Sequence, residues 1–210
     1  MPEIPNIEGV RHYFGKALSE HGTTAAGADW NSVYSQEIRF AQLIKVIGEK
    51  DSFTILDYGC GYGALAEYLA NQGFKYAHFY GVDILEPMIA EANRIHSDQA
   101  RHTFSTELGE IPVVDYAVAS GVFNARLDTS YEEWTEYVLE TLHSIDNRTR
   151  KGFAVNFLTK YSDAEKMQER LYYADPGYLF DYCKRHISFN VALLHDYGLY
   201  DFTLIIRKKA

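Results

Sequence analysis

Three glycines at alternate positions form the most distinctive stretch of the chain. Gly59, Gly61 and Gly63 stand between an apolar segment, 53–58, and a segment of helical character, 64–73. Glycine permits a tight turn and lets a ligand approach the backbone, and the N-terminus of the following helix offers free N–H groups. The pattern predicts a ligand-binding loop at the carboxyl end of a strand.

Two carboxylates accompany this loop. Asp83 closes the next predicted strand, 78–84, where an acid can accept hydrogen bonds from both hydroxyls of a ribose. Asp57 stands just before the loop, where a carboxylate favours an ammonium group and repels a pyrophosphate. The loop and the two acids together predict a cofactor that contains a nucleoside.

A nicotinamide- or flavin-dependent oxidoreductase is an alternative at this point. The loop matches the dinucleotide pattern G-x-G-x-x-A through Gly59, Gly61 and Ala64. Asp57 disfavours this alternative, and so does the predicted end of the chain. Segment 187–208 has the character of two strands joined by a turn too short for a parallel crossover, so the pair must be antiparallel, which is foreign to the dinucleotide fold.

Strands and helices alternate before that hairpin, which indicates a parallel sheet wrapped by helices on both faces. The hydrophobic periodicity and the turn residues predict strands at 53–58, 78–84, 101–106, 113–120 and 151–159, and helices at 31–48, 64–73, 86–96, 131–145 and 176–185. No linker divides the 210 residues, so we expect a single domain.

The composition restricts the partners. A formal net charge of −9 disfavours a nucleic-acid partner, and no stretch approaches the roughly 20 apolar residues of a membrane span. Cys60 and Cys183 are too few for a disulfide framework or a structural zinc site. The N-terminus has no features of a signal peptide, so we expect a cytoplasmic protein. No His, Asp or Glu cluster has the spacing of a metal site, so we expect no bound metal.

Several motifs carry a family resemblance. LDYGCGYG resembles motif I of the class I S-adenosylmethionine-dependent methyltransferases, GVDI their ribose-binding second motif, and DYAVASGVFN their motif IV. The chain also resembles a narrower bacterial group of small methyltransferases in its W-N-S…Q…R-F, A-S-G-V-F-N, F-N-F-L and H-D-Y…D-F-T motifs. The resemblance spans roughly residues 29–207 and implies a Rossmann-like α/β fold, with a seven-stranded, mostly parallel sheet and an antiparallel C-terminal hairpin.

The resemblance implies S-adenosylmethionine as the cofactor and assigns residues to it. Asp57, Gly59, Cys60 and Gly61 would hold the methionine part, and Asp83 the ribose. Ile84 and Glu107 would lie at the adenine, Ser120, Gly121 and Val122 would wall the site, and Arg39 would pair with the methionine carboxylate or form a surface ion pair.

The resemblance further implies methyl transfer to an oxygen or nitrogen of a small metabolite. His195, followed by Asp196, is the candidate general base, and Asn124 could orient the substrate, although a hairpin histidine and a capping asparagine are the structural alternatives. Residues 1–50 would form a helical lid over a core of residues 51–210. We expect substrate contacts from the lid residues Tyr13 and Trp30 and from Tyr172 and Tyr173. A non-catalytic module that binds S-adenosylmethionine remains the second alternative, and neither the acceptor nor the oligomeric state is predicted.

Overall fold

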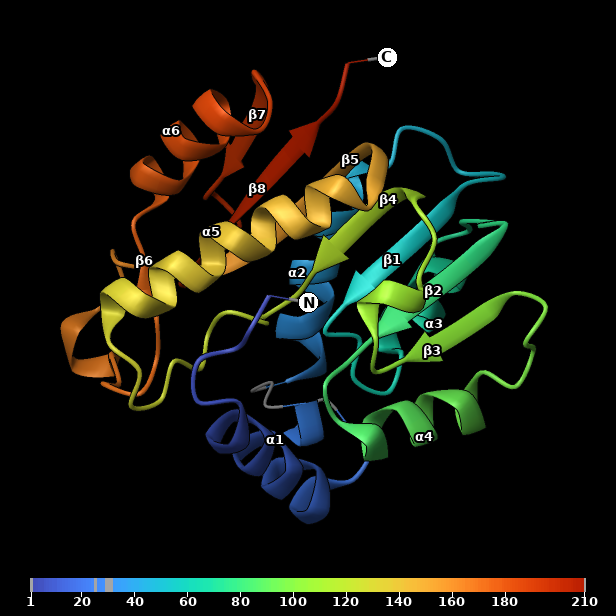
Figure 1. Cartoon of the computed structure of the whole chain (residues 1–210), viewed down its shortest axis with the longest axis horizontal. Helices are drawn as coiled ribbons and strands as arrows, with labels where there is room; N and C mark the ends of the chain where they lie inside the picture. Colours follow the sequence, from blue (N-terminus) through green and yellow to red (C-terminus); the bar gives the residue numbers. More distant parts are fainter. Residues whose placement is uncertain (1, 25, 29–31, 210) are drawn as a thin grey trace.

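Eight strands form one sheet in the computed structural model, which describes residues 2–24, 26–28 and 32–209 (Figure 1). The strand order is β3-β2-β1-β4-β5-β8-β7, and a short β6 pairs with β5 outside this order. β8 runs antiparallel to both of its neighbours, and the other pairs are parallel. The predicted fold class is therefore confirmed, including the C-terminal hairpin.

The elements agree closely with the predicted ranges. The strands are β1 Thr54–Tyr58, β2 His78–Val82, β3 His102–Ser105, β4 Val114–Ala119, β5 Thr149–Thr159, β6 Tyr173–Ala174, β7 Asn190–Leu194 and β8 Asp201–Arg207. The helices are α1 Ile7–His21, α2 Val33–Leu43, α3 Ala64–Asn71, α4 Glu86–Ile95, α5 Tyr131–Asn147 and α6 Pro176–His186. The two-residue β6 was not predicted.

Alternate residues of the central strands belong to two separate cores, one on each face of the sheet. In β1, Leu56 packs in the core with α5 and α6, whereas Ile55 packs in the core with α2, α3 and α4. In β5, Val155 belongs to the core with α5 and α6, and Ala154 belongs to the core with α2, α3 and α4. Because side chains alternate across a strand, a continuous apolar strand needs cover on both faces, and the helices supply it.

The strand order creates a crevice between β1 and β4. The chain leaves β1 toward β2 through α3 and leaves β4 toward β5 through α5, and these two helices lie on opposite faces of the sheet. The loops after the two strands therefore diverge and leave space at the carboxyl edge, which is where open α/β sheets bind ligands.

Helix α1 lies at this same end of the molecule, whereas α2 runs along one face of the sheet. Figure 1 shows α1 on the side toward which β1 and β4 point. Ser32 caps α2 by accepting a hydrogen bond from the backbone N–H of Ser35, 3.1 Å away. Arg39 of α2 forms a buried ion pair with Asp201 at the start of β8. This pair fastens the N-terminal part of the chain to the C-terminal hairpin.

Breaking this ion pair on one side should destabilise the fold. Arg39→Met leaves the carboxylate of Asp201, which is 1% exposed, without its guanidinium partner. We expect the free energy of unfolding, measured by urea titration, to fall by about 3 to 5 kcal/mol. The double variant Arg39→Met/Asp201→Asn should lose less, because no charge is then left buried. Arg185→Met, which breaks an exposed pair with Asp181, should cost less than about 1 kcal/mol. A loss of that small size for Arg39→Met would contradict the anchoring role.

Candidate functional site

The glycine loop follows β1 and is held against the ends of β2 and β4. Gly59, Gly61 and Gly63 have φ angles of 78°, 52° and 86°, a region that side-chain-bearing residues rarely adopt. The backbone N–H of Gly59 donates to the carbonyl of Val82 across 2.7 Å. A Cβ atom on Gly59 would lie 2.4 Å from Cγ2 of Val122. Glycine is therefore required at this position by both the turn and the closeness of the β4 end.

Asp83, directly after β2, is tied to the same loop. Its Oδ2 accepts the backbone N–H of Gly61 at 2.9 Å, and its Oδ1 accepts the N–H of Leu85 at 3.0 Å. Burial raises the pKa of this carboxyl, and the backbone N–H groups of Leu85, Gly61 and Ile84 oppose the rise. A carboxylate oxygen has more than one lone-pair direction, so each oxygen can accept a further hydrogen bond. The side chain is thus fixed in place and still able to bind two hydroxyls.

Asp57, near the end of β1, is a buried carboxyl beside Asp83. It is 3% exposed and lines the pocket in front of the loop. Burial and, to a lesser extent, the charge of Asp83 raise the pKa of Asp57 to about 8. No ion pair among the described residues involves it, so a bound cation would supply the missing partner.

Cys60 supports the loop from behind. Its side chain is buried, and Sγ lies 3.4 Å from the carbonyl oxygen of Gly61. A Cβ on Gly81 of β2 would lie 2.8 Å from this sulfur. Burial raises the pKa of the Cys60 thiol well above its usual value, so the sulfur stays protonated and is no nucleophile.

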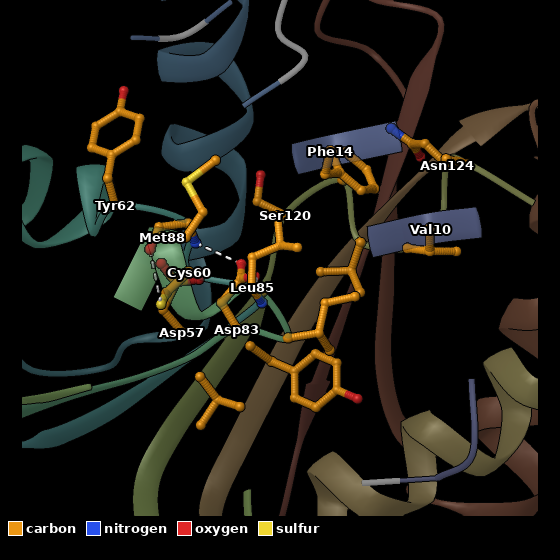
Figure 2. Close-up of a pocket in the computed structure, with 18 of the residues that line it drawn as sticks. Val10, Phe14, Asp57, Cys60, Tyr62, Asp83, Leu85, Met88, Ser120 and Asn124 are labelled. Carbon is orange, nitrogen blue, oxygen red and sulfur yellow. Dashed lines mark hydrogen bonds between the residues drawn. The ribbon is translucent and has the colours of Figure 1, made fainter. Parts of the chain in front are cut away.

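A pocket with about 1140 Å³ of empty space, its open mouth included, lies in front of the loop. Figure 2 shows Asp57, Cys60 and Asp83 on one side of the pocket and a second group of labelled side chains on the other, from Val10, Phe14 and Asn124. Ser120 lies between the two groups. The pocket thus has a carboxylate end at the glycine loop and a more apolar end beneath α1.

The segment after β4 forms the wall between the two ends. Ser120, Gly121 and Val122 all line the pocket, and the N–H of Gly121 donates to Oδ1 of Asn156 on β5 across 2.8 Å. Oγ of Ser120 and Oδ1 of Asn124 are buried without a hydrogen-bond partner among the described residues. Buried polar atoms are rarely left unpaired, so both point to hydrogen bonds with a ligand.

The structure brings most of the predicted cofactor residues together. Those that line the pocket are Asp57, Gly59, Cys60, Gly61, Asp83, Ile84, Ser120, Gly121 and Val122, and Asn124 joins them. Glu107 does not line this pocket. It is exposed at an adjoining pocket that also contains Ile84 and Arg11.

Two predicted polar contacts lie elsewhere. Arg39 does not line the pocket but pairs with Asp201, because its position on α2 directs it toward β8. His195 also lies outside the pocket: it is exposed, and its ring packs against Tyr161 and Phe202, with centroids 6.0 and 5.9 Å away. This packing corresponds to the structural alternative for His195.

The predicted aromatic substrate contacts are likewise not brought to the pocket. Tyr172 is 1% exposed in the core, and its hydroxyl bonds to Oγ1 of Thr135 at 2.9 Å. The Tyr173 hydroxyl accepts the N–H of Gln168 at 3.0 Å. The hydroxyl of Tyr13 accepts a hydrogen bond from Arg170 at 2.5 Å. Trp30 lies outside the described residues.

The sequence analysis missed the side chains that cover the pocket. They come from helices whose pocket-facing side depends on packing: Val10 and Phe14 of α1, Gln36 and Phe40 of α2, Met88 of α4, and Trp134 and Tyr137 of α5. For the apolar residues of this set the signal was their repeat at helical spacing, which also describes an ordinary core, and for Gln36 it was its place in the W-N-S…Q…R-F motif.

The described residues contain neither a candidate metal site nor a candidate membrane-spanning helix. No group of three or more His, Cys, Asp or Glu side chains in residues 2–24, 26–28 and 32–209 is arranged to hold a metal ion. In the same ranges, no helix has both the length and the apolar content that a membrane crossing requires.

Comparison with known proteins places the chain among methyltransferases. Residues 55–152 match a family model described as a methyltransferase domain. A Mycobacterium tuberculosis protein named as a methyltransferase, Rv1506c, is 46% identical over 165 residues, which are 79% of this chain and 99% of the relative.

Solved structures share the fold at low sequence identity. Human N-acetylserotonin methyltransferase in complex with S-adenosylmethionine gives a TM-score of 0.66 at 15% identity and covers 100% of this chain and 61% of its own. The N-methyltransferase NodS of Bradyrhizobium japonicum in complex with S-adenosylhomocysteine gives a TM-score of 0.65 at 12% identity, with coverage of 95% and 98%.

The raised pKa of Asp57 predicts how stability depends on pH. The folded protein holds this proton up to about pH 8, whereas an unfolded aspartate loses it near its ordinary pKa of 3.8. Between these values the folded state binds more protons than the unfolded state, so the contribution of Asp57 to stability falls as the pH rises. Asp57→Asn should remove this slope, which is roughly 1 kcal/mol per pH unit, and stabilise the ligand-free protein at pH 7. Urea unfolding at pH 5, 6 and 7 measures the difference, and parallel pH profiles for the two proteins would contradict the prediction.

Proposed function

The chain belongs to the class I S-adenosylmethionine-dependent methyltransferases, and from this we propose that it transfers a methyl group to an oxygen or nitrogen of a small-molecule acceptor in the pocket of the glycine loop. One observation carries the proposal: Asp57 and Asp83 lie at the same loop, one as a buried carboxyl without a cation and the other with both oxygens oriented by backbone N–H groups. An ammonium group and a ribose are the complementary ligands.

The residues of the site fit S-adenosylmethionine. Asp57 would face the positively charged methionine part, for which Gly59 and Gly61 leave the backbone open, and Asp83 would accept the ribose hydroxyls. Ile84, which lines the pocket next to Asp83, would pack against the adenine ring. A pyrophosphate would instead meet the carboxyl of Asp57, so the fit to a dinucleotide is poorer.

The protein would act mainly by alignment and by exclusion of water. S-adenosylmethionine supplies a methyl group already activated by a sulfonium, so the reaction needs an in-line displacement and little further activation. The wall of Ser120, Gly121 and Val122 separates the two ends of the pocket and would set the angle of approach. Val10 and Phe14 of α1 would shield the acceptor from water. In this role α1 would serve as the lid predicted for residues 1–50.

The setting and partners follow from composition. Both cysteines are free and buried, which is in keeping with a reducing, cytoplasmic setting. The net charge of −9 favours a small molecule over a nucleic acid as the methyl acceptor.

Removal of the Asp83 carboxylate should abolish cofactor binding. Asp83→Ala loses two charge-assisted hydrogen bonds to the ribose, and we expect the affinity for S-adenosylmethionine to fall by about 100-fold or more. Isothermal titration calorimetry measures this change. Asp181→Ala, which removes an exposed carboxylate of α6, serves as the control and should bind as the unmodified protein does. Retained affinity in Asp83→Ala would contradict the ribose assignment.

The unmodified protein should bind S-adenosylmethionine and not NAD. We expect calorimetric saturation with the former and no heat of binding with the latter, because the described lining offers a pyrophosphate no lysine, arginine or histidine and two acidic groups, Asp57 and Asp83. Incubation with small hydroxyl and amine compounds should then release S-adenosylhomocysteine. Binding of NAD alone would overturn the proposal.

A further inference from the structure

The end of the pocket away from the glycine loop is apolar and largely aromatic. Val10 and Phe14 of α1 lie at this end, and the pocket lining also includes Ala125 and, from α5, Trp134 and Tyr137. Figure 2 shows Val10 and Phe14 beside Asn124, on the side of the pocket opposite Asp57. Trp134 and Tyr137 are 1% and 4% exposed, and the Nε1–H of Trp134 is already bonded to the carbonyl of Phe123 at 2.8 Å. These two rings are almost fully buried, so each can meet a ligand only along the edge that lines the pocket, and the indole offers no free donor.

The described lining of this pocket carries no positive charge. Its residues include no lysine, arginine or histidine, and its only charged types are Asp57 and Asp83 at the other end. Nearby cations are engaged outside it: Arg170 bonds to the Tyr13 hydroxyl, and Arg126 to the carbonyl of Thr129 at 2.6 Å. A carboxylate or phosphate placed against these rings would lose its hydration without a counter-charge, which is costly.

One polar side chain at the apolar end, that of Asn124, has an atom that is unpaired within the described part of the chain. The backbone of Asn124 is fixed by bonds to Gly121 (3.3 Å) and Tyr172 (2.8 Å), while its Oδ1 is buried without a partner among the described residues. An amide oxygen only accepts hydrogen bonds, so the complementary group is an O–H or N–H donor. Oγ of Ser120, in the wall toward the glycine loop, is also buried without a partner.

Among the described residues that line this end, none is suited to remove a proton. Burial raises the pKa of the Tyr137 hydroxyl, so it stays protonated, and the only histidine that the sequence suggested, His195, lies outside the pocket. An aliphatic alcohol needs a general base, whereas an aromatic hydroxyl or an aromatic amine reacts with less assistance. Both of these are also uncharged near neutral pH and flat enough to pack between rings.

We propose that the methyl acceptor is an uncharged aromatic hydroxyl or aromatic amine compound, held between the rings of α1 and α5 with its O–H or N–H donated to Oδ1 of Asn124. This inference rests on the proposed function and narrows its substrate class. In the transfer, the methyl carbon forms a bond to the acceptor oxygen or nitrogen, and the carbon–sulfur bond breaks with its electron pair returning to sulfur. The acceptor proton leaves to solvent.

Two matched probes test the charge preference. The protein is first saturated with S-adenosylhomocysteine, and calorimetry monitors this binding. It is then titrated with 2-naphthol or with 6-hydroxy-2-naphthoate, and ligand-observed NMR measures the affinity for each probe. We expect 2-naphthol to bind at least 10-fold more tightly than the carboxylate. Phe14→Lys places a cation in the lining and should reverse this order. Lys16→Met, at an exposed position of the same helix, is the control and should leave it unchanged.

A second variant tests the hydrogen bond. Asn124→Ala should weaken 2-naphthol binding about 5- to 10-fold and leave the affinity for S-adenosylhomocysteine unchanged, which also shows that the variant is folded. If S-adenosylhomocysteine itself does not bind, the proposed function fails and this inference with it. If it binds but the carboxylate probe binds as well as 2-naphthol, or neither probe binds, the inference alone is overturned.

Discussion

Two neighbouring carboxyl groups, the buried Asp57 and the half-buried Asp83, have no basic partner among the described residues, and the site depends on this constraint. Asp57 and Asp83 end neighbouring parallel strands, so the register of β1 with β2 sets their separation. The glycine loop crosses between them and supplies a backbone N–H to Asp83. The free protein tolerates this arrangement only by keeping Asp57 protonated near neutral pH. A cationic ligand would pair with the ionised carboxylate of Asp57. The arrangement thus lowers the stability of the ligand-free protein and favours binding of a cation.

The two ends of the pocket differ in how the fold makes them. The carboxylate end is built from strand termini and a loop of fixed geometry, in which Gly59 leaves no space for a Cβ beside Val122. The apolar end is built from helix faces, with α5 fixed in the core and α1 above the pocket. Strand ends suit a cofactor that all members of a family share, and helix faces can vary with the acceptor.

The sequence predicted those features that depend on local chemistry. The glycines and Asp83 were identified as ligand-binding residues because each follows a predicted strand of a parallel sheet, at the edge where such sheets bind ligands. The antiparallel hairpin was predicted because the turn near Asp196 is too short for a parallel crossover. The residues that the structure placed elsewhere have side chains whose direction is decided by tertiary packing. Arg39 and Tyr172 lie on elements next to the site, yet one points to β8 and the other into the core. Phe14 was missed for the same reason, since helical periodicity does not say which apolar face covers a pocket.

Proton release on cofactor binding tests the central claim most directly. Calorimetric titration with S-adenosylmethionine at pH 6 and 7, in two buffers of different ionisation enthalpy, reports the protons released on binding. Because the pKa of Asp57 is about 8 in the free protein and a bound cation lowers it, we predict that binding releases close to one proton and tightens as the pH rises from 6 to 7. Asp57→Asn should bind weakly and release none. Tight binding without proton release in the unmodified protein would contradict the account.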